Sequence, residues 1–236
     1  LLMFVISLTI AFRMKILEKS STKLNDLSSL FKNSLNLMIR TILLNITLFV
    51  GNKITAQQGD LQLELHTILG NLFLIAAFFL DGTASAATAI CSKLNGENNQ
   101  HAILSVGLKS VAINIFTATC FACLGYLTYP SIFRIYTENI SITPSFENMM
   151  IFYFSTILLG GVAFTMDGLF IGLERVSFLR NVLIGSTLFY VLILLLTQNY
   201  TLEGVWFALL CWMFIRAVFP LAGFVWKQRT LLSHNT

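Results

Sequence analysis

The chain has 236 residues, of which 56% are apolar and only 11% are charged, and its formal net charge at pH 7 is +4. Its mean hydropathy is +0.78. Soluble domains average about 45–50% apolar and about 25% charged residues, so this composition excludes an ordinary water-soluble protein and predicts a membrane protein.

The chain before residue 34 is predicted to have two parts. Residues 1–12 are apolar but too short to cross a bilayer, and the basic residue Arg13 follows them. We expect them to be the end of a truncated transmembrane helix. A signal peptide is the weaker interpretation, because its basic residues would precede the apolar run. Residues 13–33 are hydrophilic and predict a cytoplasmic linker between two membrane lobes.

Six apolar segments follow, each long enough to span a bilayer. A spanning helix needs about 20 mostly apolar residues, and an open strand would leave its backbone groups without partners in lipid. The sequence therefore predicts an all-α integral membrane protein with a six-helix transmembrane bundle in residues 34–226. A cytoplasmic tail is expected over residues 227–236. The predicted helices cover residues 34–57, 61–92, 103–128, 148–173, 179–197 and 203–226.

The basic residues indicate the orientation. If residues 13–33 are cytoplasmic, eleven Lys and Arg residues lie in inner segments and only two, Lys53 and Arg134, in outer ones. This asymmetry is typical of correctly assigned membrane helices. The positive net charge is thus explained by topology, and we expect the lipid bilayer, and no nucleic acid, as a partner.

Two aspartates lie inside predicted helices, each directly before a glycine: Asp81 in FFLDG and Asp167 in FTMDG. A carboxylate in hydrocarbon is costly unless it is paired, protonated or facing water, so it marks a functional site by default. Arg40 lies at a depth from which either aspartate is within reach, and Arg216 is a further candidate partner. We predict a charge network of these four residues, serving as a structural ion pair or in proton coupling.

Four other polar residues share these helices and are candidates for lining a cleft. Two lie on the helix of Arg40, where lining a cleft and bonding to neighbouring helices remain equally open. The other two recur with Asp81 at helical spacing. The four are Asn36, Asn45, Ser85 and Thr88. Gly168 and Gly172 form a GxxxG pair that is typical of closely packed membrane helices.

No motif of an enzyme or of a metal site is found. The sequence lacks a phosphate-binding glycine loop, a GxSxG elbow and an HExxH pair, and its three histidines match no catalytic spacing. Cys120 and Cys123 form a CxxC, but a zinc site needs four ligands. We therefore predict no enzyme, no metal and no cofactor.

The motifs resemble the multidrug and toxin extrusion (MATE) family. Residues 61–98 carry LELHTIL, FFLDG and KLNGE in that order, and MDGLFIG at 166–172 with Arg180-Asn181 is similar to the DNA-damage-inducible F (DinF) branch. Arg40-Thr41, GVW at 204–206 and Arg216 extend the resemblance over nearly the whole chain.

The resemblance implies the carboxy-terminal lobe of a twelve-helix fold, preceded by the end of one further helix, with a missing amino-terminal six-helix lobe as partner. In sodium-linked members a glutamate on the seventh helix and an aspartate on the tenth help to form a cation site. Asp167 has the aspartate position, whereas Arg40 has the glutamate position. A permanent guanidinium charge opposes cation binding, so a proton gradient is expected rather than sodium.

The function implied is part of a secondary efflux antiporter that works by alternating access on amphipathic organic cations. It would be a multi-pass protein of the bacterial inner membrane. Two alternatives stay open: a flippase for a lipid-linked substrate in the same superfamily, and a truncated remnant that does not transport.

Overall fold

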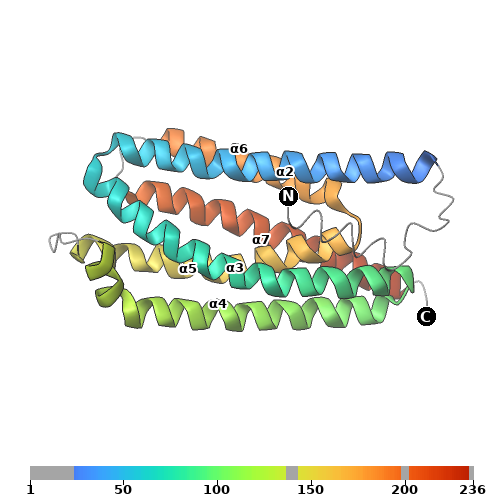
Figure 1. Ribbon diagram of the computed structural model, residues 1–236. Coiled ribbons are helices and arrows are strands. Elements are labelled where there is room, and N and C mark those ends of the chain that lie inside the picture. Colours follow the sequence, from blue (N-terminus) through green and yellow to red (C-terminus); the bar gives the residue numbers. More distant parts are fainter. Residues whose placement is uncertain (1–23, 137–142, 198–201, 234–236) are drawn as a thin grey trace, which may run out of the picture. The chain divides into compact units, whose positions relative to one another are not determined.

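The computed structural model describes residues 24–136, 143–197 and 202–233. In these residues the secondary structure is helical throughout, and no strand occurs (Figure 1). The six helices are α2 (Leu24–Gln57), α3 (Asp60–Gly96), α4 (Gln100–Tyr136), α5 (Thr143–Gly172), α6 (Val176–Leu196) and α7 (Leu202–Ser233). Each contains a segment long and apolar enough to cross a membrane. The predicted all-α membrane fold with six spanning helices is confirmed.

Several helices extend beyond their apolar segments. α2 begins at Leu24, so residues 24–33 of the predicted linker are helical, although its apolar span begins only at Phe31. α7 continues to Ser233, through most of the predicted tail. Hydropathy predicts only the part of a helix that crosses the bilayer. The helix itself can continue past that part until a helix-ending signal in the sequence. Residues 1–12 and 13–23 lie outside the described residues, and the predictions for them stay predictions.

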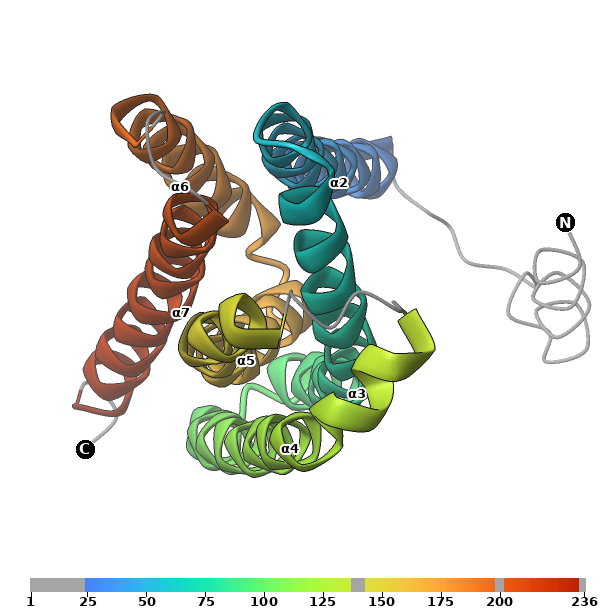
Figure 2. The same ribbon diagram turned by 90° about the vertical axis from the view of Figure 1, so that its left-hand side faces the viewer.

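Contacts divide the chain into a unit of Leu1–Leu35 and a unit of Asn36–Thr236. The first contributes only the opening turns of α2 to the described residues. Within the second, α5 is central: it packs most extensively on α3, α7 and α4, while α6 packs mainly on α7 (Figure 2). Because lipid tails are as apolar as the side chains, close packing and hydrogen bonds must hold such helices together.

The crossing of α3 and α5 brings backbone against backbone. A Cβ atom at Gly168 would collide with the carbonyl oxygen of Ala84, and one at Gly172 would lie 2.6 Å from the carbonyl oxygen of Thr88. The Thr88 hydroxyl donates to the carbonyl of Gly168 at 2.8 Å, and the Ser92 hydroxyl donates to that of Gly172 at 3.2 Å. The glycines therefore permit a parallel pair of helices joined by direct hydrogen bonds.

The turns α3–α4 and α5–α6 have the same construction. Asn98 and Glu174 have φ angles of 54° and 57°, in the left-handed region. The next amide in each turn, that of Asn99 or Arg175, donates to the carbonyl five residues earlier, at 3.0 Å and 2.8 Å. This is the Schellman helix end, with asparagine or glutamate in place of the usual glycine. Each turn is thus fixed by its own backbone.

A buried asparagine joins three helices. The side-chain amide of Asn114 on α4 donates to the carbonyl of Leu80 on α3 at 3.2 Å and to the hydroxyl of Thr165 on α5 at 2.8 Å. Asn114 and Thr165 are both fully buried. The group α3–α4–α5 is therefore held by polar bonds at its centre as well as by glycine packing.

Candidate functional site

Asp167 is the centre of a buried charge cluster. Its Oδ2 accepts from Nη2 of Arg216 at 2.7 Å and from Nη2 of Arg40. The side chains of Asp167, Arg40 and Arg216 are only 12%, 16% and 5% exposed. One carboxylate on α5 thus binds two guanidinium groups, one from α2 and one from α7. These three side chains together carry a net charge of +1.

Arg216 is held by aromatic rings and sulfur as well as by the aspartate. Its guanidinium carbon lies 4.5 Å from the ring centroid of Trp212 and 5.9 Å from that of Phe164. Its Nη1 donates to the sulfur of Met213 at 3.7 Å. A desolvated cation–π contact contributes about 2 kcal/mol. The surroundings therefore keep an arginine charged in the interior of the lobe.

One helical turn before Arg40, a second polar contact joins α2 to α6. Asn36 is buried; its Oδ1 accepts from Nη1 of Arg180 at 2.7 Å, and its Nδ2 donates to the hydroxyl of Ser177 at 3.4 Å. Asn36 therefore bonds to a neighbouring helix, one of the two interpretations that the sequence left open.

Asp81 lies apart from this cluster. It is exposed, as are Gly82 and Ser85, and it makes no ion pair with any described residue. Of the two predicted partners of Arg40, Asp167 is the one that forms the ion pair, with Arg216 as its second cation, and Asp81 makes no direct contact with these three side chains. The physical reason is the rotation of α3: Leu80, which is fully buried, points into the core and turns the adjacent Asp81 outward.

Two of the residues predicted to line a cleft have other contacts. Thr88 is half-buried and its hydroxyl bonds across the α3–α5 crossing, so its role there is packing. Asn45 is exposed and donates to the carbonyl of Thr41 on its own helix at 2.8 Å. Ser85 remains on the exposed face of α3, beside Asp81.

Sequence reasoning missed the chain of hydroxyls that joins α2 to α6 and α7. The hydroxyls of Thr47 and Thr187 lie 3.2 Å apart, and the indole of Trp212 donates to Thr187 at 3.4 Å. Both threonines are buried. A threonine in an apolar span gives only a weak signal, because its hydroxyl can bond to its own helix, as Thr47 also does with Leu43 at 2.9 Å.

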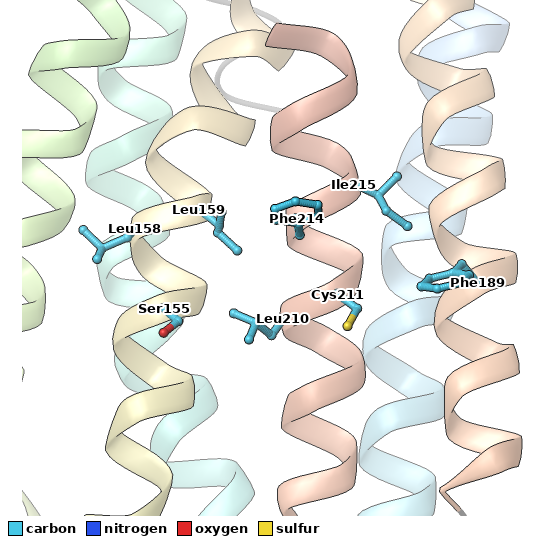
Figure 3. A pocket seen from close by; sticks show the side chains of 8 residues that line it. All are labelled: Ser155, Leu158, Leu159, Phe189, Leu210, Cys211, Phe214 and Ile215. Atoms are coloured by element: carbon cyan, nitrogen blue, oxygen red, sulfur yellow. The ribbon is translucent and has the colours of Figure 1, made fainter. Parts of the chain in front are cut away.

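A groove of about 700 Å³ lies between α5, α6 and α7 (Figure 3). Its lining is apolar apart from Ser155 and Cys211, and Phe214 and Phe189 are exposed along it. Ser155 and Cys211 are therefore the polar side chains that this groove offers, and no charged residue lines it.

A second cavity, of about 360 Å³, lies between α2, α3 and the beginning of α7, and its lining is mixed. Asn52, Asn71 and Thr67 contribute polar groups. The rings of His66 and Trp206 meet edge to face, 5.9 Å between centroids. The Nδ1 of His66 and the Nε1 of Trp206 are buried without a hydrogen-bond partner. His66 and Trp206 belong to the LELHTIL and GVW motifs, but neither was predicted as a site residue.

No metal centre is formed by the part of the chain that the structure describes. There, no group of three or more His, Cys, Asp or Glu side chains could hold an ion. Cys120 and Cys123 are exposed free thiols. The chemistry of the described site is therefore that of charge pairs, hydroxyls and amides.

Sequence comparison finds transporter relatives. The sequence profile of the MatE family matches residues 37–196, more than half of the chain. "Protein DETOXIFICATION 44, chloroplastic" of Arabidopsis thaliana is 22% identical over 183 residues, which are 76% of this chain and 34% of that protein. "DNA damage-inducible protein F" of Escherichia coli (strain K12) is 23% identical over 193 residues, 82% of this chain and 42% of that protein. The chain thus spans about a third to two fifths of these relatives.

The solved structures agree. The structure titled "Outward-facing conformation of a multidrug resistance MATE family transporter of the MOP superfamily" has a TM-score of 0.80 at 19% identity, covering 98% of this chain and 54% of that one. "Crystal structure of MATE in the straight conformation" matches with 0.80 at 18% identity, covering 98% and 54%. At this identity the likeness shows the fold alone. With the profile match, it follows that the chain is a multi-pass membrane protein that belongs to the MATE family.

Proposed function

We propose that the chain is the carboxy-terminal lobe of an exporter of the DinF branch, which moves amphipathic compounds by alternating access between two six-helix lobes. The match to the E. coli protein over 82% of the chain supports this branch. The coverage of about half of the solved transporters supports a second lobe of similar size. A bacterial inner membrane is the proposed location.

The shared carboxylate of Asp167 is the observation that carries the coupling proposal. A sodium ion at Asp167 would lie beside two guanidinium groups, both of which donate to Oδ2. Because guanidinium stays charged at every relevant pH, the cluster repels a further cation. We therefore assign Asp167 a structural role and assign proton exchange to Asp81, the intramembrane acid that has no ion pair among the described residues.

The mixed cavity beside His66 supports an amphipathic substrate. Its lining combines apolar and aromatic side chains, among them Trp206 and Phe73, with the neutral amides of Asn52 and Asn71. No Lys or Arg lines it, so an organic cation would meet no repulsion there. Amphipathic organic cations therefore remain the proposed substrates. The alternative of a lipid-linked flippase has no described residue that favours it.

The test is a transport assay in everted vesicles, with ethidium as probe and the chain produced together with a six-helix amino-terminal lobe. We expect ethidium transport under a proton gradient and none under a sodium gradient. Equal transport under both gradients would contradict proton coupling. No transport by the two-lobe protein would favour the remnant interpretation.

The assignment of Asp81 has its own test. The Asp81→Asn variant should lose proton-driven transport while its level in the membrane stays normal. Asp60→Asn, an exposed acid in the first turn of the same helix, is the matched control and should transport normally. Normal transport by Asp81→Asn would refute the assignment.

A further inference from the structure

A third cavity, of about 440 Å³, lies at the end of the lobe that holds the α5–α6 turn. It is bounded by that turn and by the last third of α7. Arg175 and Glu174 of the turn and Lys227 of α7 provide its charged lining, and Phe170, Phe178 and Trp226 provide rings. The cavity is separate from the Asp167 cluster and from the His66 cavity, which lies near the opposite ends of the helices.

The cavity lies at the depth of a membrane surface. The apolar span of α5 ends at Gly172 and that of α6 begins at Val176, so Arg175 occupies a three-residue connection between two crossings. α7 has 32 residues, which is about 48 Å of helix against a hydrocarbon core of about 30 Å. Its final turns therefore leave the core, and the cavity places Lys227 level with the turn.

The two basic side chains of this cavity are unpaired within the described part of the chain. Neither Arg175 nor Lys227 makes an ion pair or a side-chain hydrogen bond with a described residue. Glu174 shares the lining, which leaves a net charge of +1. Glu174 forms no ion pair with Arg175, and burial lowers the pKa of Arg175. An anionic group placed between the two cations would offset the cost of that burial.

The position of Arg175 is fixed before any ligand binds. Its amide is bonded to the carbonyl of Phe170 at 2.8 Å, and the amide of Glu174 is bonded to that of Ile171 at 3.0 Å. Because this turn is held by its own backbone, little backbone entropy is lost when the guanidinium contacts an anion, and the remaining cost is that of ordering the side chain.

The remainder of the lining suits a lipid. The rings of Phe170 and Phe178 stack with centroids 4.9 Å apart, and Gly223 leaves room beside them, since a Cβ there would lie 3.3 Å from Phe178. Trp226 is 75% exposed, as is typical of tryptophan at the level of lipid headgroups. Apolar rings beside two basic groups match the first part of an acyl chain and the phosphate of one phospholipid.

We propose that this cavity, formed by the α5–α6 turn and α7, binds the phosphate headgroup of an anionic phospholipid through Arg175 and Lys227. Basic pockets between membrane helices at the bilayer surface bind such headgroups. This inference does not depend on the transported substrate.

The test uses the full chain, purified and incorporated into nanodiscs that contain phosphatidylglycerol and phosphatidylcholine in equal amounts. Native mass spectrometry after detergent release measures the lipid retained. We expect phosphatidylglycerol to be retained preferentially, with about a tenfold loss of this preference in the double variant Arg175→Gln/Lys227→Gln and about a threefold loss in each single variant. Lys227→Arg should keep the preference.

Arg229→Gln is the matched control, because Arg229 is exposed on the same turn of α7 but does not line the cavity. Its preference should equal that of the wild type. Equal retention of both lipids, an unchanged double variant, or an equal loss in Arg229→Gln would overturn the proposal. Inorganic phosphate at millimolar concentration should not displace the lipid; complete displacement would show a site for free phosphate and would also overturn it.

Discussion

The crossing of α3 and α5 and the attachment of α2 are built in opposite ways. At the crossing, Gly168 and Gly172 let two backbones touch along more than a turn. α2 instead reaches α5 through Arg40 and α6 through Asn36 and Thr47, in separate polar contacts. A glycine interface tolerates little change of shape, whereas polar contacts can be exchanged one at a time. The comparison identifies α3–α5 as the rigid part of the lobe and α2 as the part most easily displaced.

The largest expected effect comes from Asp167→Asn, which removes the anion shared by α2 and α7. Arg216 would remain buried and charged, with Arg40 beside it as a like charge. Leaving such a charge unpaired costs about 3–5 kcal/mol. Thermal unfolding in detergent micelles should show this loss of stability.

Arg40→Gln removes one of the two ion pairs of Asp167, the one that joins it to α2. Arg216 keeps its partner in this variant, so the loss of stability should be smaller than in Asp167→Asn. Hydrogen exchange should increase in α2 and remain unchanged in α5. An Arg40→Gln variant that loosens α5 as much as α2 would break the distinction between the two regions.

The next effect is steric. Gly168→Ala forces a methyl group against the carbonyl of Ala84, and overpacking of this kind costs about 1–3 kcal/mol. Gly82→Ala is the control, because a Cβ there has no atom within 4 Å, and it should be neutral or slightly stabilising. If both variants unfold at the same temperature, the close approach of α3 and α5 is not a source of stability.

Much of the architecture could be predicted from the sequence. The sequence has six apolar segments, and each must be a helix because an open strand would leave its backbone groups unpaired in lipid. The spacing of Gly168 and Gly172 indicates close helix packing. The depth of Arg40 in the bilayer allowed a pair with Asp81 or Asp167. Choosing between them requires the rotation of α3 about its axis, which depends on which side of the helix the core buries. Phe78 is 75% exposed and Leu80 is fully buried, although hydropathy alone does not distinguish them.

The residues that line the cavities could not be predicted from the sequence either, because they come together only through the rotation and crossing of the helices. His66 and Trp206 are 140 positions apart in the sequence, and nothing local predicts that their rings meet. Arg175 is a basic residue in a short turn, typical of the cytoplasmic side, and only the folded chain places it beside Lys227. Sequence patterns identify residues that are costly in lipid, whereas their partners follow from helix rotation and crossing.

A smaller effect is expected at the contact between Thr47 of α2 and Thr187 of α6. Thr47→Val removes the bond to Thr187 while keeping the side-chain volume, and an interhelical hydroxyl bond in membrane proteins contributes about 0.6 kcal/mol. Thr119→Val is the control, since Thr119 is exposed and bonds only to Ile115 on its own helix. Hydrogen exchange of α2 should increase in Thr47→Val and not in Thr119→Val. An equal increase in both variants would show that the bond between Thr47 and Thr187 does not hold α2 in place.

The smallest expected effect on stability is that of Asp81→Asn. Because Asp81 is exposed and has no ion pair in the described residues, its replacement should change the free energy of unfolding by less than about 0.5 kcal/mol, against several kcal/mol for Asp167→Asn. The two substitutions are chemically identical and lie in parallel helices of the same crossing, so their difference measures the combined effect of burial and pairing. An Asp81→Asn variant as unstable as Asp167→Asn would mean that Asp81 has a partner within the lobe. In that case its exposed face on α3 would not be available for proton exchange, and the two aspartates would have a single, structural role.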